Sequence, residues 1–317
     1  MKVLVTGASG NIGSHAVPEL LRQGQSVRCF TRDTPEGRRH ARALPRGAEA
    51  AFGDVLDPDA LRRAAAGVDA VVHLAAVIPP GSEEDPEHAR EVNVEGTRNA
   101  VAACRAQPRR PRLLFASTFD VHGHTLARPP PRRITDPLVA TDGYTAAKIE
   151  AEGIVRASGL EWCIFRLSDV PVLGIRDPHP IMFEIGLHNR IEALHADDAA
   201  LAVANALGTP EAWGRVLFVG GGPSCQLTYG EYLRRLLEAM GIDMLPAEAF
   251  AAKEYATDWI DTEESQRLLR YQRHGFDDIA EAIAASLGWK RHLLPLARSA
   301  AHAAMLKLSP YWRKAGR

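Results

Sequence analysis

A short apolar run followed by spaced glycines opens the chain and limits its fold more than any other feature. Val3 to Thr6 is apolar and β-branched, as a buried strand is, and a helical pattern runs through Leu20 and Leu21. The turn between them contains Gly7, Ser9, Gly10, Asn11, Ile12 and Gly13. A strand, a glycine turn and a helix in this order begin a βαβ unit whose helix N-terminus can meet a pyrophosphate. The motif therefore predicts dinucleotide binding.

The rest of the chain alternates between strand and helix patterns. Further strands are expected at 26–31, 48–52, 68–76, 112–117, 162–167 and 216–219. Helices are expected at 58–66, 90–106, 144–158, 197–207, 229–240 and 278–286. Alternation of this kind predicts an α/β fold of the Rossmann type, with a doubly wound parallel sheet and a smaller C-terminal lobe. Two long polar segments, 79–87 and 122–142, follow strands and are expected near the ligand.

We expect residues 1–170 to form the NAD(P)-binding domain, with 192–220 returning to it. Residues 171–191 and 221–317 would then form the substrate-binding lobe.

Composition and charge exclude several classes of protein. The chain has 317 residues, 38 Lys+Arg and 39 Asp+Glu, so its net charge gives no case for binding nucleic acid or an anionic membrane. We find neither a signal peptide nor an apolar run long enough for a membrane span. The four cysteines lie far apart, which predicts no metal site and no disulfide framework. A cytoplasmic protein is expected.

The end of the second predicted strand bears on the choice of cofactor. NAD-binding proteins place an acidic side chain there, whereas this chain has Thr31 and Arg32, with Asp33 beyond the usual position. A guanidinium suits a 2′-phosphate, so NADP is preferred and NAD stays possible. The alternative is that Arg32 is only a solvated residue. After the third strand, Asp54 and Val55 are candidates to contact adenine, or Asp54 is simply a helix N-cap.

Tyr144 and Lys148 stand one helical turn apart and therefore share a helix face. Tyrosine ionises near pH 10, so as an acid or base at neutral pH it needs a nearby cation, which the lysine supplies. A hydroxyl pair, Ser117 and Thr118, ends the preceding strand. Together with the glycine turn, this set is a strong signal of redox chemistry on a carbonyl or alcohol.

These motifs resemble those of the extended short-chain dehydrogenase/reductase superfamily, in its NAD(P)-dependent epimerase/dehydratase family. The matching segments are TGASGNIG, VVHLAA, NVEGTRN, LLFASTFDVHG, YTAAK, FRLSDV and ALHADDAALAVANAL. The resemblance implies that Tyr144 is the general acid/base, that Lys148 holds the nicotinamide ribose and that Thr118 hydrogen-bonds the reacting oxygen. It assigns Asn93 to supporting the proton relay and to cofactor binding. It adds further cofactor contacts from Leu74, Ala75, Ala76, Ser117, Leu167, Asp169 and Val170.

Departures from the family pattern narrow the reaction. Dehydratases of this family carry an Asp-Glu pair after the threonine, whereas Thr118 is followed by Phe119 and Asp120, which disfavours elimination. His122 replaces the usual tyrosine, and Asp169 replaces the usual asparagine. We therefore predict an NADP(H)-dependent oxidoreductase acting on a carbonyl or secondary alcohol of a small-molecule or sugar-type substrate. The alternatives are a nucleotide-sugar epimerase that holds NAD tightly and a non-catalytic NADP(H) sensor.

Other polar residues have plainer interpretations. His73 and His195 are expected to be structural, and Asp197 and Asp198 to act at a helix N-terminus. The arginines of the long loop, Arg128, Arg132 and Arg133, are expected to be solvated rather than bound to an anionic substrate. The family resemblance also implies a homodimer through the helices 90–106 and 144–158.

Overall fold

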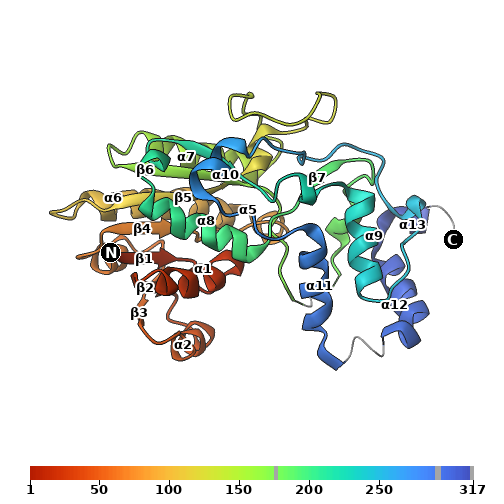
Figure 1. Cartoon of the computed structure of the whole chain (residues 1–317), viewed down its shortest axis with the longest axis horizontal. Helices are drawn as coiled ribbons and strands as arrows, with labels where there is room; N and C mark the ends of the chain where they lie inside the picture. Colours follow the sequence, from red (N-terminus) through yellow and green to blue (C-terminus); the bar gives the residue numbers. More distant parts are fainter. Residues whose placement is uncertain (175–177, 290–293, 315–317) are drawn as a thin grey trace.

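The computed structural model describes residues 1–174, 178–289 and 294–314. Its centre is a seven-stranded parallel sheet with strand order β3-β2-β1-β4-β5-β6-β8 (Figure 1). The strands are β1 (Lys2–Thr6), β2 (Ser26–Thr31), β3 (Ala48–Phe52), β4 (Ala70–His73), β5 (Arg112–Thr118), β6 (Trp162–Leu167) and β8 (Val216–Val219). The predicted α/β fold with a doubly wound parallel sheet is confirmed.

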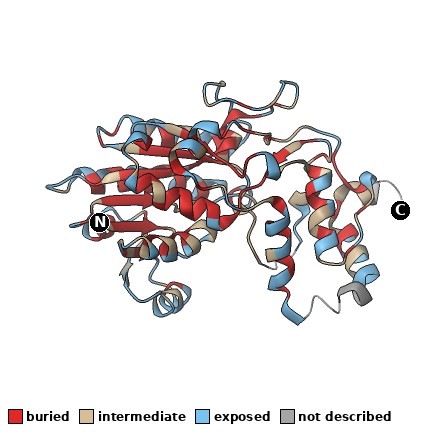
Figure 2. Ribbon diagram, in the orientation of Figure 1, coloured by how far each residue is buried: buried red, intermediate tan, exposed pale blue. Residues whose placement is uncertain are grey.

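Helices cover both faces of this sheet, so its central strands are apolar on both sides. The longer helices are α1 (Asn11–Arg22), α2 (Pro35–Arg42), α3 (Pro58–Ala64), α6 (Gly96–Arg105), α7 (Gly143–Arg156) and α8 (Ala196–Gly208). On one face, α1 and α8 pack together over a cluster that includes Val5 and Val72. On the other face, α3, α6 and α7 cover a second cluster around Leu4 and Leu113. Figure 2 shows the central strands as a buried layer between the helices.

The smaller lobe lies beyond one end of the sheet (Figure 1). It contains an antiparallel pair of short strands, β7 (Arg190–Glu192) and β9 (Gln226–Thr228). Its helices are α9 (Tyr229–Ala239), α11 (Phe276–Ser286), α12 (Leu294–Leu308) and α13 (Pro310–Lys314). Its own core contains Phe183, Tyr232 and Phe276. Parts of the predicted lobe, at 175–177, 290–293 and 315–317, lie outside the described residues.

One segment differs from the predicted division. Helix α10 (Glu263–Leu269) ends in Leu269, and Leu269 and Tyr271 belong to the same buried cluster as β1 and α8. The chain therefore returns to the sheet a second time within 221–317, the range expected to belong wholly to the lobe.

The predicted strands are found, and all but one agree with the expected bounds to within one residue at each end. The strand expected at 68–76 is shorter in the structure, where β4 spans Ala70–His73 and the chain then leaves the sheet. The expected helix 90–106 begins as a π-helical turn, η1 (Glu91–Glu95), before α6. Two short helices, α4 (Gly81–Glu84) and α5 (Pro86–Arg90), occupy the segment expected to be a loop. None of the helices in the described ranges has the length and apolar character that crossing a membrane requires.

Candidate active site

The glycine turn forms a cradle that side chains would fill. A Cβ on Gly13 would lie 2.1 Å from the carbonyl oxygen of Gly7, and Gly7 itself has φ +69° and faces the backbone of Ala75. Gly10 is the N-cap of α1 and brings no side chain to the free N–H groups of the first turn, which also carries no acidic residue. These N–H groups and the positive end of the helix dipole suit a pyrophosphate. The turn therefore fits a dinucleotide.

Other predicted cofactor contacts surround this turn. The Asn11 amide donates to the carbonyl oxygen of Val170 at 2.7 Å, which ties the turn to the segment after β6. Ser9 is exposed and Ile12 is half-buried at the helix start. Asp169 is exposed, but its carboxylate accepts a hydrogen bond from the Tyr232 hydroxyl at 2.9 Å. The glycine turn and the carboxyl end of β6 therefore share one edge of the sheet.

At the predicted adenosine end, Thr31 is buried and Arg32 is exposed. Asp33 pairs with Arg38, whose Nε lies 2.6 Å from the carboxylate. Asp54 accepts from the Leu56 N–H at 2.9 Å, while Asp57 accepts from the first two N–H groups of α3. The N-cap of this helix is thus Asp57, and the simple capping role considered for Asp54 is wrong. Val55 is buried against Gly96.

The segment after β4 is held by a chain of buried hydrogen bonds. Thr6 Oγ1 lies 2.7 Å from His73 Nδ1 and accepts from the N–H of Ala75. His73 Nε2 lies 3.3 Å from the hydroxyl of Thr97. Burial lowers the pKa of His73 to about 3, with a smaller effect from Lys148, so this ring is neutral. The structural role predicted for His73 is confirmed, and Leu74, Ala75 and Ala76 are half-buried beside the glycine turn.

Asn93 lies in the π-helical turn and is buried. Its amide accepts from the N–H of Val77 at 2.9 Å and donates to the carbonyl of Val77 at 2.8 Å. Asn93 therefore fixes the backbone just beyond the predicted cofactor contacts. Its part in a proton relay stays a prediction.

The helix that carries Tyr144 and Lys148 starts at a capping box made by Asp142 and Thr145. Lys148 is buried, and its Nζ donates to the Ala116 carbonyl at 2.9 Å and lies 6.0 Å from the centre of the Tyr144 ring. Burial lowers the pKa of Lys148 to about 8, and Glu152 opposes this effect. The ammonium is therefore positioned by the strand that ends in Thr118 and stays mostly charged at neutral pH.

Tyr144 has an environment that keeps its proton in place. Burial raises the pKa of the phenol, the Asp120 carboxylate raises it further, and a hydrogen bond with the Thr118 hydroxyl lowers it. Thr118 Oγ1 also accepts from the N–H of Asp120 at 3.2 Å, at the start of the turn η2 (Phe119–His122). Thr118 and Tyr144, predicted to act together, are thus brought together.

Asp120 was not among the predicted site residues, although its carboxylate raises the pKa of Tyr144. Burial raises the pKa of its carboxyl to about 7, and the charges of Asp169 and Asp142 add to this effect. Its place two residues after the predicted catalytic threonine was the available signal.

His122, which replaces the usual tyrosine of the family pattern, hydrogen-bonds to other parts of the protein. It is buried, with Nδ1 3.1 Å from the Pro137 carbonyl and Nε2 3.0 Å from the Arg166 guanidinium. Arg166 in turn pairs with Glu152, which accepts from the Ser117 hydroxyl at 2.7 Å. Neither Glu152 nor Arg166 was predicted as a site residue. The spacing of Glu152 from Lys148, four residues along one helix, was the signal that could have found it.

A histidine cluster lies near the start of α8. His195 is its N-cap, so Asp197 and Asp198 supply first-turn acids rather than the cap. Ligand atoms of His195, Asp197 and His274 lie within 4.8 Å of one another. The two imidazole rings stack 4.1 Å apart at 19°, so their in-plane lone pairs run side by side and do not converge on one ion. This arrangement favours the structural role.

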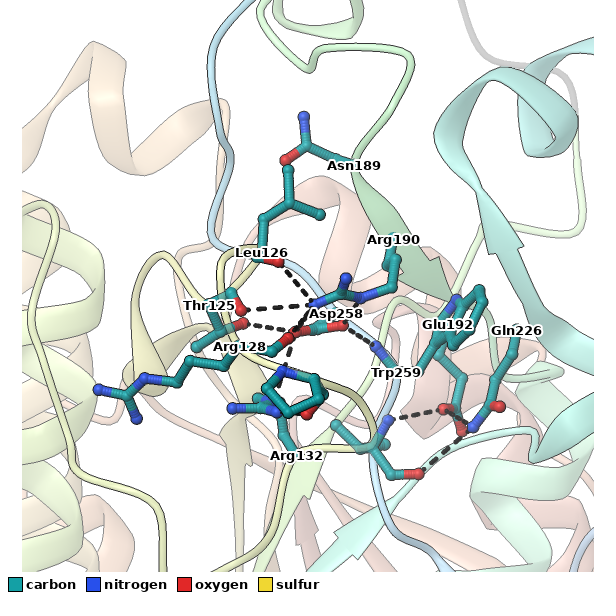
Figure 3. Close-up of polar contacts among 12 residues, drawn as sticks. Thr125, Leu126, Arg128, Arg132, Asn189, Arg190, Glu192, Gln226, Asp258 and Trp259 are labelled. Carbon is teal, nitrogen blue, oxygen red and sulfur yellow. Dashed lines mark hydrogen bonds and ion pairs between the residues drawn. The ribbon is translucent and has the colours of Figure 1, made fainter.

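Figure 3 shows the polar contacts that join the long loop to the smaller lobe. The buried Asp258 carboxylate accepts from Arg190 at 2.5 and 2.9 Å and from the Thr125 hydroxyl at 2.8 Å, and lies 3.5 Å from Arg132. Arg132 is buried, so the prediction that this residue is solvated is wrong; Arg128 and Arg133 are exposed as expected. A polar, proline-rich loop predicts that its arginines face solvent. Asp258, which is distant in the sequence, instead pairs with Arg132 in the interior.

Next to it, the buried Glu192 carboxylate accepts from the Gln226 amide (Figure 3). It also accepts from the N–H groups of Gly222 and Ile260. A Cβ on Gly220 would lie 2.2 Å from this carboxylate, which explains a glycine at that position. Burial raises the pKa of Glu192 to about 7 against these donors. The carboxylates of Asp258 and Glu192 together fix β7, β9 and residues 258–261 against the loop 122–142.

Several known proteins are similar to this chain in sequence or in fold. A 2-alkyl-3-oxoalkanoate reductase of Stenotrophomonas maltophilia is 37% identical over 121 residues, 38% of this chain and 34% of that protein. The matches span 28% to 54% of the length of the first curated relatives.

Among solved structures, a dTDP-glucose 4,6-dehydratase double mutant from Streptomyces venezuelae, with NAD bound, has a TM-score of 0.79 at 24% identity. The match covers 92% of this chain and 98% of the dehydratase chain. An NAD-bound UDP-glucose-4-epimerase from Stenotrophomonas maltophila has a TM-score of 0.76 at 21% identity, covering 94% and 99%. These likenesses show the fold. The family model of the NAD dependent epimerase/dehydratase family matches residues 3–182, and the chain belongs to that family.

Proposed function

We propose that the chain is an NADP(H)-dependent oxidoreductase that interconverts a carbonyl and a secondary alcohol of a small-molecule or sugar-type substrate. The observation that carries the proposal is the grouping of Thr118, Tyr144 and buried Lys148 at the carboxyl end of β5. The glycine turn lies at the same edge of the parallel sheet, where such folds bind nucleotides.

The side chains divide the work as follows. In reduction, the Thr118 hydroxyl hydrogen-bonds the carbonyl oxygen and the Tyr144 phenol donates a proton to it. Burial raises the pKa of Tyr144, so the phenol carries that proton at neutral pH. The Lys148 ammonium stabilises the phenolate left behind, and the proton is replaced from solvent. A bound nicotinamide cofactor supplies the hydride in this direction and accepts it in the other.

The preference for NADP rests on charge at the end of β2. Arg32 is exposed there, and the carboxylate of Asp33, the nearest acid, is already paired with Arg38. An arginine is suited to a 2′-phosphate, whereas NAD recognition needs a carboxylate free to accept from ribose hydroxyls. Arg32→Ala is expected to raise the KM for NADPH about tenfold and leave the KM for NADH unchanged. Equal KM values in the variant and the parent would reject this assignment.

The first experiment is a fluorescence titration with NADPH and NADH, followed by mass spectrometry of any cofactor released on denaturation. Preferred binding of NADPH to an empty site supports the reductase. Retained NAD would favour an epimerase that recycles its cofactor. Tyr144→Phe should lower kcat/KM for a carbonyl substrate by about 100-fold or more. Binding without turnover of any carbonyl in a broad panel would favour a sensor.

We also propose a cytoplasmic homodimer that pairs through α6 and α7. These helices lie side by side within one chain, where Glu150 of α7 pairs on the surface with Arg98 of α6 and with Arg90 at the end of α5. All four cysteines are buried and unpaired, which suits a reducing compartment. Mass photometry should give twice the mass of one chain, and a single-chain mass would reject the dimer.

A further inference from the structure

A buried ion pair lies along the helix that carries Tyr144 and Lys148, and the proposed mechanism does not use it. Glu152 follows Lys148 by four residues and Tyr144 by eight, so all three share one face of α7. Arg166 donates to both oxygens of the Glu152 carboxylate, at 2.9 and 2.7 Å, and each side chain is only 2% exposed. Two such charges are costly to bury, so the pair contributes little to stability compared with apolar residues of the same size.

The pair joins the catalytic helix to two strands of the sheet. Ser117 and Arg166 are partners in the register of β5 and β6, and both donate to Glu152. Ser117 directly precedes Thr118, and Ala116, one residue earlier, accepts from Lys148. Glu152 thus fixes α7 to the strand whose end carries the predicted catalytic hydroxyl.

Two arginines contact Glu152: Arg166, and the more exposed Arg156 of α7, whose Nη2 donates to Glu152 Oε2 at 3.1 Å. The positive charge of the buried Arg166 is committed to Glu152. Its third contact, at 3.0 Å, is with Nε2 of His122. Arginine can only donate, so Nε2 accepts and Nδ1 carries the proton toward the Pro137 carbonyl. Burial, together with the nearby guanidinium, lowers the pKa of His122 to about 4, so His122 is neutral and takes no share of the Glu152 charge.

Lys148 faces few titratable groups. His73 from β4 is neutral, Tyr144 is a neutral phenol, and the Phe115 ring from β5 lies 5.0 Å from Nζ. Asp120 and Asp142 raise the pKa of Tyr144. Glu152 is the carboxylate that raises the pKa of Lys148 against the effect of burial.

We propose that Glu152, held by Arg166 and Ser117, is a positioning residue that keeps Lys148 cationic and fixes the catalytic helix against the end of β5. The inference rests on the proposed function of Tyr144 and Lys148. It explains why a charged pair occupies a place that apolar side chains would fill at lower cost.

The test compares the parent enzyme with E152Q, which keeps the shape and removes the charge, and with E150Q, an exposed glutamate on the same helix. The midpoint of Lys148 is followed by the ¹³Cε chemical shift in lysine-labelled protein without cofactor. We expect E152Q to lower this midpoint by about one pH unit, because a close opposite charge shifts a pKa by roughly that much or more. The alkaline limb of kcat should move by the same amount, and E150Q should move neither. A Lys148 midpoint within 0.3 units of the parent in folded E152Q overturns the proposal.

A second variant decides the matter if E152Q does not fold. E152D keeps the charge but is too short to meet Ser117 and Arg166 together. It should leave the Lys148 midpoint in place and lower kcat about 10- to 100-fold, with KM unchanged, as a small misplacement of catalytic groups does. Parental kcat in E152D overturns the positioning role. If Tyr144→Phe keeps full activity, the proposed function fails; the NMR midpoints report on Lys148 without turnover, so the two failures are distinguishable.

Discussion

Replacing Asp258 by alanine should destabilise the protein far more than removing an ordinary surface charge. Asp258 has no exposed side-chain surface, and the side chains of its partners Arg190 and Arg132 are 16% and 5% exposed. Removing one member of a buried ion pair leaves an uncompensated charge and costs about 3–5 kcal/mol.

Local contacts adjust this figure in both directions. The Thr125 hydroxyl and the Trp259 N–H also lose their acceptor, which adds about 1 kcal/mol each. Against this, Arg190 Nη2 keeps the carbonyls of Leu126 and Arg128 at 3.2 and 2.9 Å. We therefore expect Asp258→Ala to lose about 4 kcal/mol of unfolding free energy. For a chain of this size the Tm should fall by about 8 °C.

The assay is thermal unfolding followed by far-ultraviolet circular dichroism. Asp59→Ala is the matched control, because its pair with Arg62 is exposed on both sides, at 67% and 61%, and should cost under about 1 kcal/mol. Adding Arg190→Met to Asp258→Ala should recover part of the loss, since it removes an unpaired buried charge. If Asp258→Ala lowers the Tm no more than the control does, the argument from burial is refuted.

Three more perturbations test other parts of the structure. Gly13→Ala should abolish NADPH binding in the titration, because the new Cβ would lie 2.1 Å from the Gly7 carbonyl oxygen. The control is Gly153→Ala in α7, whose Cβ would meet nothing within 4 Å and which should raise the free energy of unfolding by about 0.5–1 kcal/mol. Asp120→Asn should remove a pH dependence. The pKa of Asp120 is raised to about 7, so ionisation destabilises the fold as pH rises from about 4 to 7 and makes Tyr144 a weaker acid above 7. The Tm slope should become shallower in the variant, with the contribution of Glu192 left, and the fall of kcat/KM above pH 7 that Asp120 causes should be lost; both should persist in Asp59→Ala. Glu192→Gln should lower the free energy of unfolding in urea by about 1–3 kcal/mol, because the glutamine NH₂ group must face an N–H donor. Stability equal to the parent's would show that the Glu192 carboxylate is already protonated.

The sheet could be predicted because each of its strands can be identified from a short run of consecutive residues. Val3 to Val5 and Val71 to Val72 are fully buried on both faces of the sheet, so each strand appears as an uninterrupted apolar run. The glycine spacing and the four-residue separation of Tyr144 and Lys148 are equally local. Helix α2 was missed because its residues Pro35 to Arg42 are polar on nearly every side. Strands β7 and β9 are three residues each, too short to show alternation.

The polar contacts of the site depend on residues distant in the chain. Arg190 and Asp258 are separated by 68 positions, and Ser117 and Glu152 by 35. An arginine in a polar, proline-rich loop is normally solvated, so a prediction of exposure for Arg132 follows from composition alone. Only the tertiary structure brings a buried carboxylate to it. Glu152 could have been predicted, because helical spacing places it one turn after Lys148 on the same face of α7. Its partner Arg166 could not, because it comes from strand β6.

These buried charges also decide how the long loop behaves. Loops of this length that follow a strand end are usually mobile. Here His122 is bonded to Arg166 at one end, and Thr125 and Arg132 are held by Asp258 farther along. Because Arg166 also holds Glu152 of α7, the loop, α7 and the smaller lobe are joined through hydrogen bonds. The loop is therefore held at several points along its length, and we expect it to be less mobile than its length and its place after a strand suggest.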